Sequence, residues 1–214
     1  MRIIKVDPEA PSISEVKVIS EALKKGKVVV LPTETVYTLA VDATNKSAIE
    51  KVYQIKGRDF NKPLHVVVTS LKMAENYVEI NKQARLLAKN FLPGPLTLVL
   101  LKRGGILPEI LTSGISTLGI RIPKLELNLL ISKEIGLPYT TTSANKSGGS
   151  NPYSVSLVMA QLAGKKNELD LIVDIGNLPN LLPSTLVDLT ISPAKILREG
   201  PIKKEELEKF IDIV

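Results

Sequence analysis

Short apolar runs alternate with stretches of helical spacing along the whole chain. Apolar runs and period-two alternation predict strands at Arg2–Val6, Val28–Leu31, His65–Thr69, Leu96–Leu101, Leu118–Ile122, Tyr139–Thr142, Leu171–Asp174, Thr185–Asp188 and Lys195–Leu197. Helical spacing predicts helices at Ser14–Lys25, Lys46–Lys56, Leu71–Tyr77, Lys82–Phe91, Leu125–Glu134, Val155–Ala163 and Lys203–Phe210. Because strands and helices interleave throughout, we predict an α/β fold with a twisted, mixed, open sheet flanked by helices.

The chain shows no internal repeat, low-complexity tract or long linker. We therefore expect a single domain over residues 1–214, with a core of about 12–200 and a C-terminal helix of about 203–212. Asn45 and Asn81 stand directly before two predicted helices, where a short side-chain oxygen can accept from a free first-turn N–H. Both are expected to be N-caps.

Composition narrows the classes of protein. No apolar run of about eighteen residues occurs, so no membrane partner is expected. The first residues lack a signal-peptide pattern, and cysteine is absent. The lack of cysteine excludes a disulfide framework, a thiol nucleophile and a cysteine-ligated metal, and it fits a cytoplasmic protein.

The formal net charge is +6, which suits an anionic partner such as a phosphate or a nucleic acid. The basic residues come in ones and twos, and most are read as solvated surface charge. With no Trp, 3 Phe and 5 Tyr, few aromatic rings are left to stack on bases. The composition therefore weakens a single-strand-binding interpretation.

Polar segments follow two of the predicted strands directly. Val28–Leu31 runs into Pro32-Thr33-Glu34-Thr35, and Tyr139–Thr142 runs into Ser143-Ala144-Asn145-Lys146-Ser147-Gly148-Gly149. Ligands of open α/β sheets bind at strand ends, so both segments are candidate binding elements, although each also fits an ordinary polar turn. No Walker A or G-x-G-x-x-G pattern occurs, so a bound nucleotide would need other phosphate contacts.

Three cations, Lys56, Arg58 and Lys62, lie at the end of a predicted helix. Guanidinium groups bind phosphate oxygens with paired N–H bonds, and ammonium groups add a point charge. The same cations could simply complement the negative end of the helix dipole. Arg121 interrupts an apolar alternation, and it could face solvent or a cleft; Ser184 and Arg198 present the same choice.

His65 is the only histidine. Because no cluster of His, Asp and Glu has ligand spacing, a zinc site is not expected. No G-x-S-x-G elbow is present, which also disfavours a Ser-His-Asp hydrolase. A lone histidine of this kind is more often structural than catalytic.

Taken in order, seven short motifs resemble those of the YrdC-like threonylcarbamoyl-AMP synthases, from about Ser12 to Gly200. The motifs are Pro32-Thr33-Glu34-Thr35-Val36-Tyr37, Lys56-Gly57-Arg58, Pro93-Gly94-Pro95-Leu96-Thr97, Gly119-Ile120-Arg121-Ile122-Pro123, Thr142-Ser143-Ala144-Asn145, Ser184-Thr185-Leu186-Val187-Asp188 and Arg198-Glu199-Gly200. Each motif alone is weak, whereas their joint order is specific.

The resemblance implies a deep basic cavity in which ATP, L-threonine and bicarbonate give threonylcarbamoyl-AMP and pyrophosphate, with Mg²⁺ accompanying the ATP. This is the first step of threonylcarbamoyladenosine modification of tRNA. The implied partners are a downstream threonylcarbamoyl transferase complex, with tRNA as a further candidate. By motif position, the threonine contacts are Thr35, Arg121, Thr141 and Ser184, and the nucleotide contacts are Lys56, Arg58, Lys62, Thr117, Ser143, Asn145, Asn151 and Arg198. Lys56 and Arg58 take the catalytic role.

The sequence departs from the family at a histidine that many relatives have nine residues after the arginine of the Lys-x-Arg motif. That position is Val67 here. His65 lies two residues earlier, on the same face of a predicted strand. We therefore expect His65 to reach the cavity and to tune threonine binding. A second departure is Thr38, where relatives often have glycine.

The chemistry agrees with the resemblance. A carbamate attacking the α-phosphorus of ATP needs positioning and cations more than a covalent nucleophile, and it needs water to be excluded. Two alternatives remain. One is a non-catalytic RNA-binding module that uses the basic cavity, and the other is a carbamoyl phosphate-dependent maturation domain. The zinc-binding cysteines of the longer proteins that contain the latter are missing here.

Overall fold

The structure is a computed structural model that describes residues 1–214. Its strands are β1 (Arg2–Lys5), β2 (Val29–Leu31), β3 (Thr38–Ala40), β4 (His65–Val67), β5 (Leu96–Leu101), β6 (Thr117–Arg121), β7 (Tyr139–Ser143), β8 (Leu171–Asp174), β9 (Thr185–Asp188) and β10 (Lys195–Arg198). Its α-helices are α1 (Ile13–Lys24), α2 (Lys46–Lys56), α3 (Leu71–Ala74), α4 (Lys82–Phe91), α5 (Glu126–Ile135), α6 (Val155–Gln161) and α7 (Lys204–Leu207). Two 3₁₀ helices, η1 (Glu109–Thr112) and η2 (Ala163–Glu168), complete the set.

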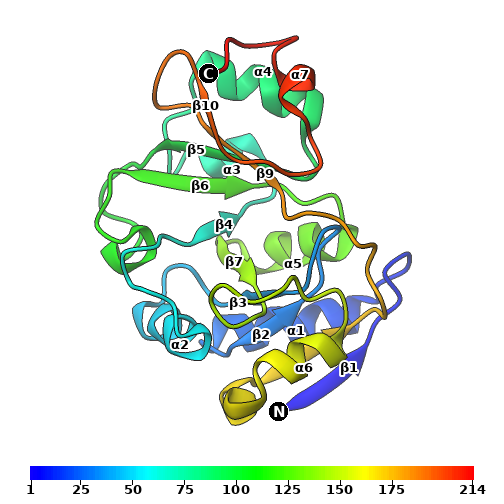
Figure 1. Ribbon diagram of the computed structural model, residues 1–214. Coiled ribbons are helices and arrows are strands. Elements are labelled where there is room, and N and C mark those ends of the chain that lie inside the picture. Colours follow the sequence, from blue (N-terminus) through cyan, green and yellow to red (C-terminus); the bar gives the residue numbers. More distant parts are fainter.

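The strands form one mixed, twisted sheet in the order β1-β8-β2-β3-β7-β4-β6-β5-β9-β10 (Figure 1). Strand β7 is antiparallel to both of its neighbours, β3 and β4. It lies in the middle of the strand order and connects the two halves of the sheet. Parallel pairs such as β4–β6 and β5–β9 occur together with antiparallel pairs such as β5–β6. The predicted α/β class with a mixed, open sheet flanked by helices is confirmed.

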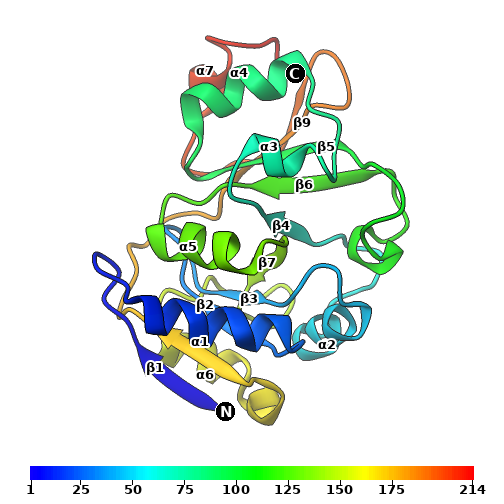
Figure 2. The same cartoon turned by 180° about the vertical axis from the view of Figure 1, so that it is seen from behind.

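Helices cover both sides of the sheet. Helices α1 and α5 pack together on one side, and Figure 2 shows them in front of β2 and β3. Helix α6 lies on the opposite side, while α4 and α7 cover the β10 end (Figure 1). Phe91 of α4 meets Phe210 edge to face, with ring centroids 5.4 Å apart. None of the helices has the length and apolarity that a bilayer span requires.

The buried apolar residues form two clusters, one on each side of the sheet. Strand β2 contributes to both, because Val30 belongs to the larger cluster whereas Val29 and Leu31 belong to the smaller one. Alternate side chains of a strand point to opposite faces, so a strand covered on both sides is apolar at every position. The continuous run Val28–Leu31 has this pattern.

Short polar side chains fix the start of the long helices. Asn45 Oδ1 accepts from the N–H of Ala48 at 3.1 Å, and Asn81 Oδ1 accepts from the N–H of Ala84 at 2.8 Å. Both predicted N-caps are confirmed. Helix α1 begins after Ser12, whose hydroxyl accepts from the N–H of Glu15 in a capping box.

Several elements differ from the prediction. Strand β3 was missed, because all three of its residues are buried and show no alternation. Helices α3 and α7 each end after four residues, so the longer ranges predicted there were wrong. Helix α6 ends at Gln161, and η2 follows it. Gly164 lies in η2, and glycine disfavours continuation of an α-helix.

Candidate functional site

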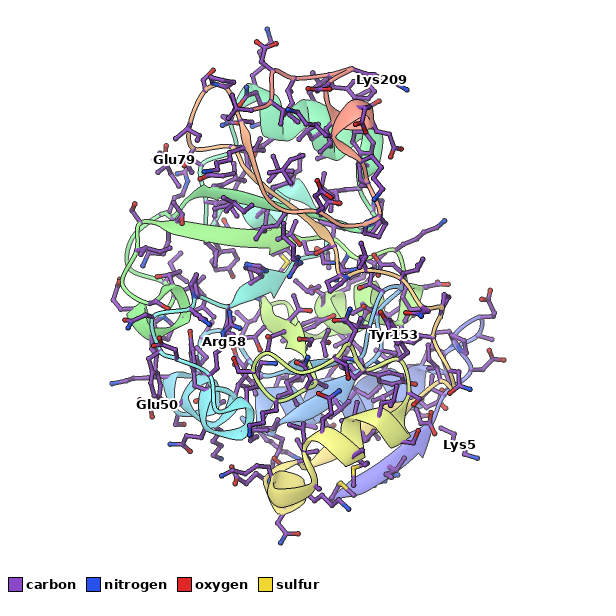
Figure 3. All side chains as sticks on the ribbon, viewed as in Figure 1. Lys5, Glu50, Arg58, Glu79, Tyr153 and Lys209 are labelled. Carbon is purple, nitrogen blue, oxygen red and sulfur yellow. The ribbon has the colours of Figure 1, made fainter.

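A polar cavity of about 110 Å³ lies where the ends of several strands meet the turn after β2 and the segment after α2. Figure 3 shows Arg58 at the side of this region between α2 and β4. Fifteen residues line the cavity and only two of them are hydrophobic, so it suits a polar ligand. They are Thr35, Val36, Thr38, Arg58, Pro63, Leu64, His65, Thr97, Arg121, Thr141, Thr142, Ser143, Pro183, Ser184 and Arg198.

The turn between β2 and β3 is organised around the hydroxyl of Thr33. This Oγ1 donates to the carbonyl of Val36 at 2.8 Å and accepts from the N–H groups of Thr35 and Val36, each at 3.2 Å. It also lies 3.0 Å from Thr35 Oγ1. The polar Thr-Glu-Thr segment is therefore rigid, and it holds Thr35 at the cavity wall.

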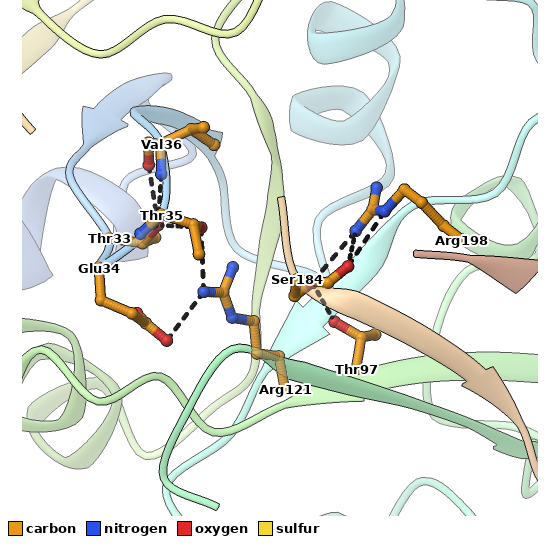
Figure 4. A network of polar contacts seen from close by, with 8 residues as sticks. All are labelled: Thr33, Glu34, Thr35, Val36, Thr97, Arg121, Ser184 and Arg198. Atoms are coloured by element: carbon orange, nitrogen blue, oxygen red, sulfur yellow. Dashed lines mark hydrogen bonds and ion pairs between the residues drawn. The ribbon is translucent and has the colours of Figure 1, made fainter. Parts of the chain in front are cut away.

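Arg121, the last residue of β6, is almost fully buried beside this turn (Figure 4). Its Nη2 donates to Thr35 Oγ1 at 3.1 Å and lies 2.9 Å from Glu34 Oε1. Arg121 Nε and both carboxylate oxygens of Glu34 have no hydrogen-bond partner, so Glu34 is held to Arg121 as an ion pair. Arg121 therefore does not lie on a solvated sheet face; it faces the cleft, paired with a carboxylate.

A second polar network lies on the other side of Arg121, as Figure 4 shows. Arg198 donates to the carbonyl of Ser184 from Nε at 3.1 Å and from Nη2 at 2.7 Å. Nη2 also reaches Ser184 Oγ at 3.1 Å, and that oxygen lies 2.7 Å from Thr97 Oγ1. The sheet brings these residues together, because Thr97 pairs with Arg121 across β5–β6 and β9 runs along the other edge of β5.

Helix α2 delivers Arg58 to the cavity. The helix ends at Gly57, which adopts a left-handed conformation with φ of 55° that glycine tolerates best. Arg58 follows this turn and donates to the carbonyls of Lys62 and Pro63 at 3.1 and 3.0 Å. Burial lowers the pKa of Arg58, and the side chain lines the cavity, where it can meet a ligand.

Lys56 is fully buried and does not line the cavity. Its ammonium donates to the carbonyls of Ser143 and Asn145 and to Asn145 Oδ1, the latter two at 3.0 and 2.9 Å. Burial, and secondarily Arg58, lowers the pKa of Lys56 to about 7. In this conformation Lys56 anchors the loop after β7.

Asn145 completes that anchor. Its Nδ2 donates to the carbonyls of Gly149 and Ser150 at 2.9 and 3.0 Å, and its Oδ1 accepts from Ser143 Oγ at 2.7 Å. Asn145 thus holds the conformation of the loop without lining the cavity, whereas Ser143 lies on the cavity wall. These hydrogen bonds fix the conformation of the loop, so it is not an unconstrained polar turn.

Besides Lys56 and Asn145, three more of the proposed nucleotide contacts lie outside the cavity wall. Lys62 is exposed, and it contributes its backbone carbonyl to Arg58. Thr117 begins β6, at the opposite end of that strand from Arg121. Asn151 donates from Nδ2 to the hydroxyl of Tyr153 at 3.2 Å. The structure does not bring these side chains together with the other candidates.

His65 lines the cavity, as expected from its place on β4. It pairs with Thr141 across β4–β7, while Val67 packs in the smaller apolar cluster. Burial lowers the pKa of His65 to about 3, with Arg198, Arg58 and Arg121 lowering it further in that order. The imidazole is therefore neutral at pH 7.

The family model Sua5_yciO_yrdC, described as telomere recombination, matches residues 21–200. The chain belongs to the Sua5/YciO/YrdC family. The predicted resemblance to YrdC-like proteins is confirmed.

Two curated relatives of this Sua5/YciO/YrdC protein differ in how much of their own length the match covers. The threonylcarbamoyl-AMP synthase of Pyrococcus abyssi is 36% identical over 198 residues, which cover 92% of this chain and 57% of the relative. The putative threonylcarbamoyl-AMP synthase of Methanocaldococcus jannaschii is 38% identical over 200 residues, covering 91% and 92% of the two chains. The chain thus spans little more than half of the first relative and most of the second.

The solved structure of P. abyssi Sua5 complexed with L-threonine has the same fold as this Sua5/YciO/YrdC chain. It superimposes with a TM-score of 0.92 at 34% identity, over 100% of this chain and 63% of that chain. The arrangement of strands described above is therefore that of the family.

Sequence reasoning did not single out Glu34 or Thr97 as site residues of this family member. Both stood inside quoted motifs, but their roles depend on partners far along the chain, at Arg121 and Ser184. Pro63, Leu64 and Pro183 also line the cavity and gave no chemical signal.

The chain has no group of three or more His, Cys, Asp or Glu side chains placed to hold a metal. Glu34, the carboxylate next to the cavity, is already paired with Arg121. The residues present therefore do not form a protein cage for Mg²⁺. A Mg²⁺ ion here would need oxygen ligands from a bound substrate and from water.

Proposed function

We propose that this protein is an L-threonylcarbamoyladenylate synthase, a nucleotidyltransferase that converts L-threonine, bicarbonate and ATP into threonylcarbamoyl-AMP and pyrophosphate. The names of the P. abyssi and M. jannaschii relatives support this activity. The L-threonine complex of P. abyssi Sua5 supports the amino-acid substrate. These names favour the synthase over the RNA-binding alternative.

One observation on this chain carries the proposal: a single cavity holds a hydroxyl-rich arginine site next to two further arginines. Arg121 lies beside Thr35 on one side, and Arg198 and Ser184 lie on the other (Figure 4). Arg121 with the hydroxyls of Thr35 and Ser184 fits a small hydroxylated carboxylate, whereas the guanidinium groups of Arg58 and Arg198 fit phosphate oxygens. A reaction that joins an amino acid to a nucleotide needs both in one place.

The reaction begins when the free amine of threonine attacks the carbon of carbon dioxide and loses a proton to give a carbamate; with bicarbonate the same N–C bond forms and water is lost. A carbamate oxygen then attacks the α-phosphorus of ATP, and the bond to the β-phosphate oxygen breaks to release pyrophosphate. Negative charge spreads over the phosphoryl oxygens, where arginines stabilise it. The buried polar walls protect the unstable carbamate from water.

Each candidate residue receives a role from its position. Arg121, Thr35, Thr141 and Ser184 hold the threonine, while Arg58, Arg198 and Ser143 hold the phosphates. Lys56 and Asn145 keep the loop of Ser143 in shape, and Lys56 donates to phosphate only if that loop shifts. Lys62, Thr117 and Asn151 contact only parts of the nucleotide that extend beyond the cavity.

The wider pathway follows from the product. Threonylcarbamoyl-AMP is an activated acyl donor, so a threonylcarbamoyl transferase complex must pass its acyl group to tRNA in the cytoplasm. Mg²⁺ enters bound to ATP and neutralises part of the triphosphate charge. The arginines of this chain then complete the neutralisation.

Product detection tests the proposal. The protein is incubated with ATP, Mg²⁺, bicarbonate and isotopically labelled L-threonine, and the mixture is analysed by liquid chromatography and mass spectrometry. We expect labelled threonylcarbamoyl-AMP. Salt-sensitive RNA binding without any adenylate product would instead support the non-catalytic RNA-binding module.

A further inference from the structure

The three arginines of the cavity differ in charge compensation. Arg121 lies 2.9 Å from the carboxylate of Glu34, and both side chains are largely buried, at 5% and 18% exposure. Arg58 and Arg198 have no carboxylate partner, since their hydrogen bonds go to carbonyls and to one hydroxyl. One arginine is therefore neutralised and two are not.

A second observation concerns the donors of Arg121. Its Nη2 is occupied by Glu34 and Thr35. Nη1 bonds to no protein group, and Arg121 is part of the cavity wall. Glu34 does not line the cavity, and its carboxylate lies beside the guanidinium of Arg121 in Figure 4. Glu34 thus fixes the guanidinium and leaves its Nη1 edge for a ligand carboxylate.

We propose that Glu34 is a positioning and specificity-determining residue that makes the Arg121 site select a zwitterionic amino acid over a simple anion. This inference rests on the proposed function, because it takes threonine as the ligand of Arg121. The uncompensated pair, Arg58 and Arg198, then forms the separate site for the polyanionic phosphates.

The selection follows from charge. A ligand carboxylate held by Arg121 brings the neighbouring α-ammonium toward the Glu34 carboxylate, and charges in a largely buried site are poorly screened. Glu34 attracts that ammonium and weakens the pull of Arg121 on an anion that lacks one. A zwitterion is therefore favoured, and phosphates are directed to Arg58 and Arg198.

A comparison of L-threonine with an analogue that lacks only the amine separates the attraction of Glu34 for an ammonium from the attraction of Arg121 for a carboxylate. (R)-3-Hydroxybutyrate has the carboxylate, the methyl group and the hydroxyl of L-threonine but lacks its amine. We would measure the Kd of each by isothermal titration calorimetry, with a non-hydrolysable ATP analogue filling the phosphate site. The wild-type protein is expected to bind threonine at least tenfold more tightly than hydroxybutyrate.

Glu34→Gln removes the charge and keeps the size. The preference for threonine over hydroxybutyrate should fall by about tenfold, equal to about 1.4 kcal/mol, while the Kd of the ATP analogue changes by no more than about threefold. Glu34→Asp, which keeps the charge, should largely retain the preference. A general structural defect would weaken all three ligands together. Glu75→Gln breaks the exposed pair with Arg85 and is the matched control.

Two results overturn the inference: an equal affinity of the wild-type protein for both ligands, or an unchanged preference in Glu34→Gln. The first needs no variant, so the test holds even if Glu34→Gln fails to fold. Failure of the proposed function gives a different result, in which the wild-type protein binds neither ligand and makes no adenylate.

Discussion

The imidazole of His65 lies so close to the backbone of Gly119 that a Cβ on Gly119 would be 2.6 Å from His65 Cδ2. Gly119 belongs to β6, next to β4 in the sheet. The absence of a side chain at Gly119 thus creates the space in which the only histidine turns to the cavity. The glycine of the Gly119–Pro123 motif is explained by this contact and not by backbone conformation.

Gly119→Ala should therefore displace His65. We expect a loss of about 1–3 kcal/mol in the free energy of unfolding from overpacking, together with a several-fold rise in the threonine KM. Denaturant titration and steady-state kinetics measure the two effects. Gly104→Ala is the control, because a Cβ there meets nothing within 4 Å. Unchanged kinetics in Gly119→Ala would show that the position of His65 does not matter for threonine.

The half-buried His65, which faces three arginines, should make the fold sensitive to acid. Its pKa is about 3 in the folded protein and about 6.5 when unfolded, so between these values the unfolded state binds more protons. The free energy of unfolding therefore decreases as pH falls from about 6.5 toward 3. His65→Gln lacks this contribution. As pH falls through that window, its free energy of unfolding should therefore increase relative to that of the wild type. A difference that is constant with pH would contradict the burial of a neutral imidazole.

Lys56 should make the free energy of unfolding depend on pH in the alkaline range. Its pKa is about 7 when folded, against a usual 10.5, so the unfolded state binds more protons between these values. The free energy of unfolding should rise with pH across that window, and Lys56→Met should remove the rise. Lys51→Met, at an exposed position of the same helix, should leave the slope unchanged. Equal slopes in all three proteins would mean that Lys56 keeps its proton.

Arg58→Ala should abolish most turnover with little effect on the fold. Arg58 bonds to two carbonyls of a surface turn, and such contacts contribute no more than about 1 kcal/mol to stability. Turnover and the melting temperature are measured on the same preparation, with Arg85→Ala as an exposed control. A large fall in melting temperature with normal turnover would restore the helix-cap interpretation of this arginine.

The fold was largely predictable because its signals are local. The caps at Asn45 and Asn81 and the apolar run Val28–Leu31 each carry their information within a few residues. Strand β3 was not predictable in this way, since it is short and buried at every position. Its strand character comes from pairing with β2 and β7.

The site was only partly predictable because it is assembled across the sheet. The resemblance named Thr35, Arg121 and Ser184 as threonine contacts, and the structure places all three on the wall of one cavity. The resemblance could not show that the hydroxyl of Thr97 bonds to that of Ser184, 87 positions away. It also could not show that the ammonium of Lys56 is already hydrogen-bonded to the loop after β7. Such contacts depend on strand register, which no local pattern reports.

The central claim is that one cavity couples threonine, bicarbonate and ATP. Pyrophosphate release measures this coupling directly, in a continuous assay with purified protein, Mg²⁺ and ATP in bicarbonate-depleted buffer. We expect release only when both L-threonine and bicarbonate are added, and at most background release when either is omitted. A rate that is unchanged without threonine, or without bicarbonate, would contradict the proposed function.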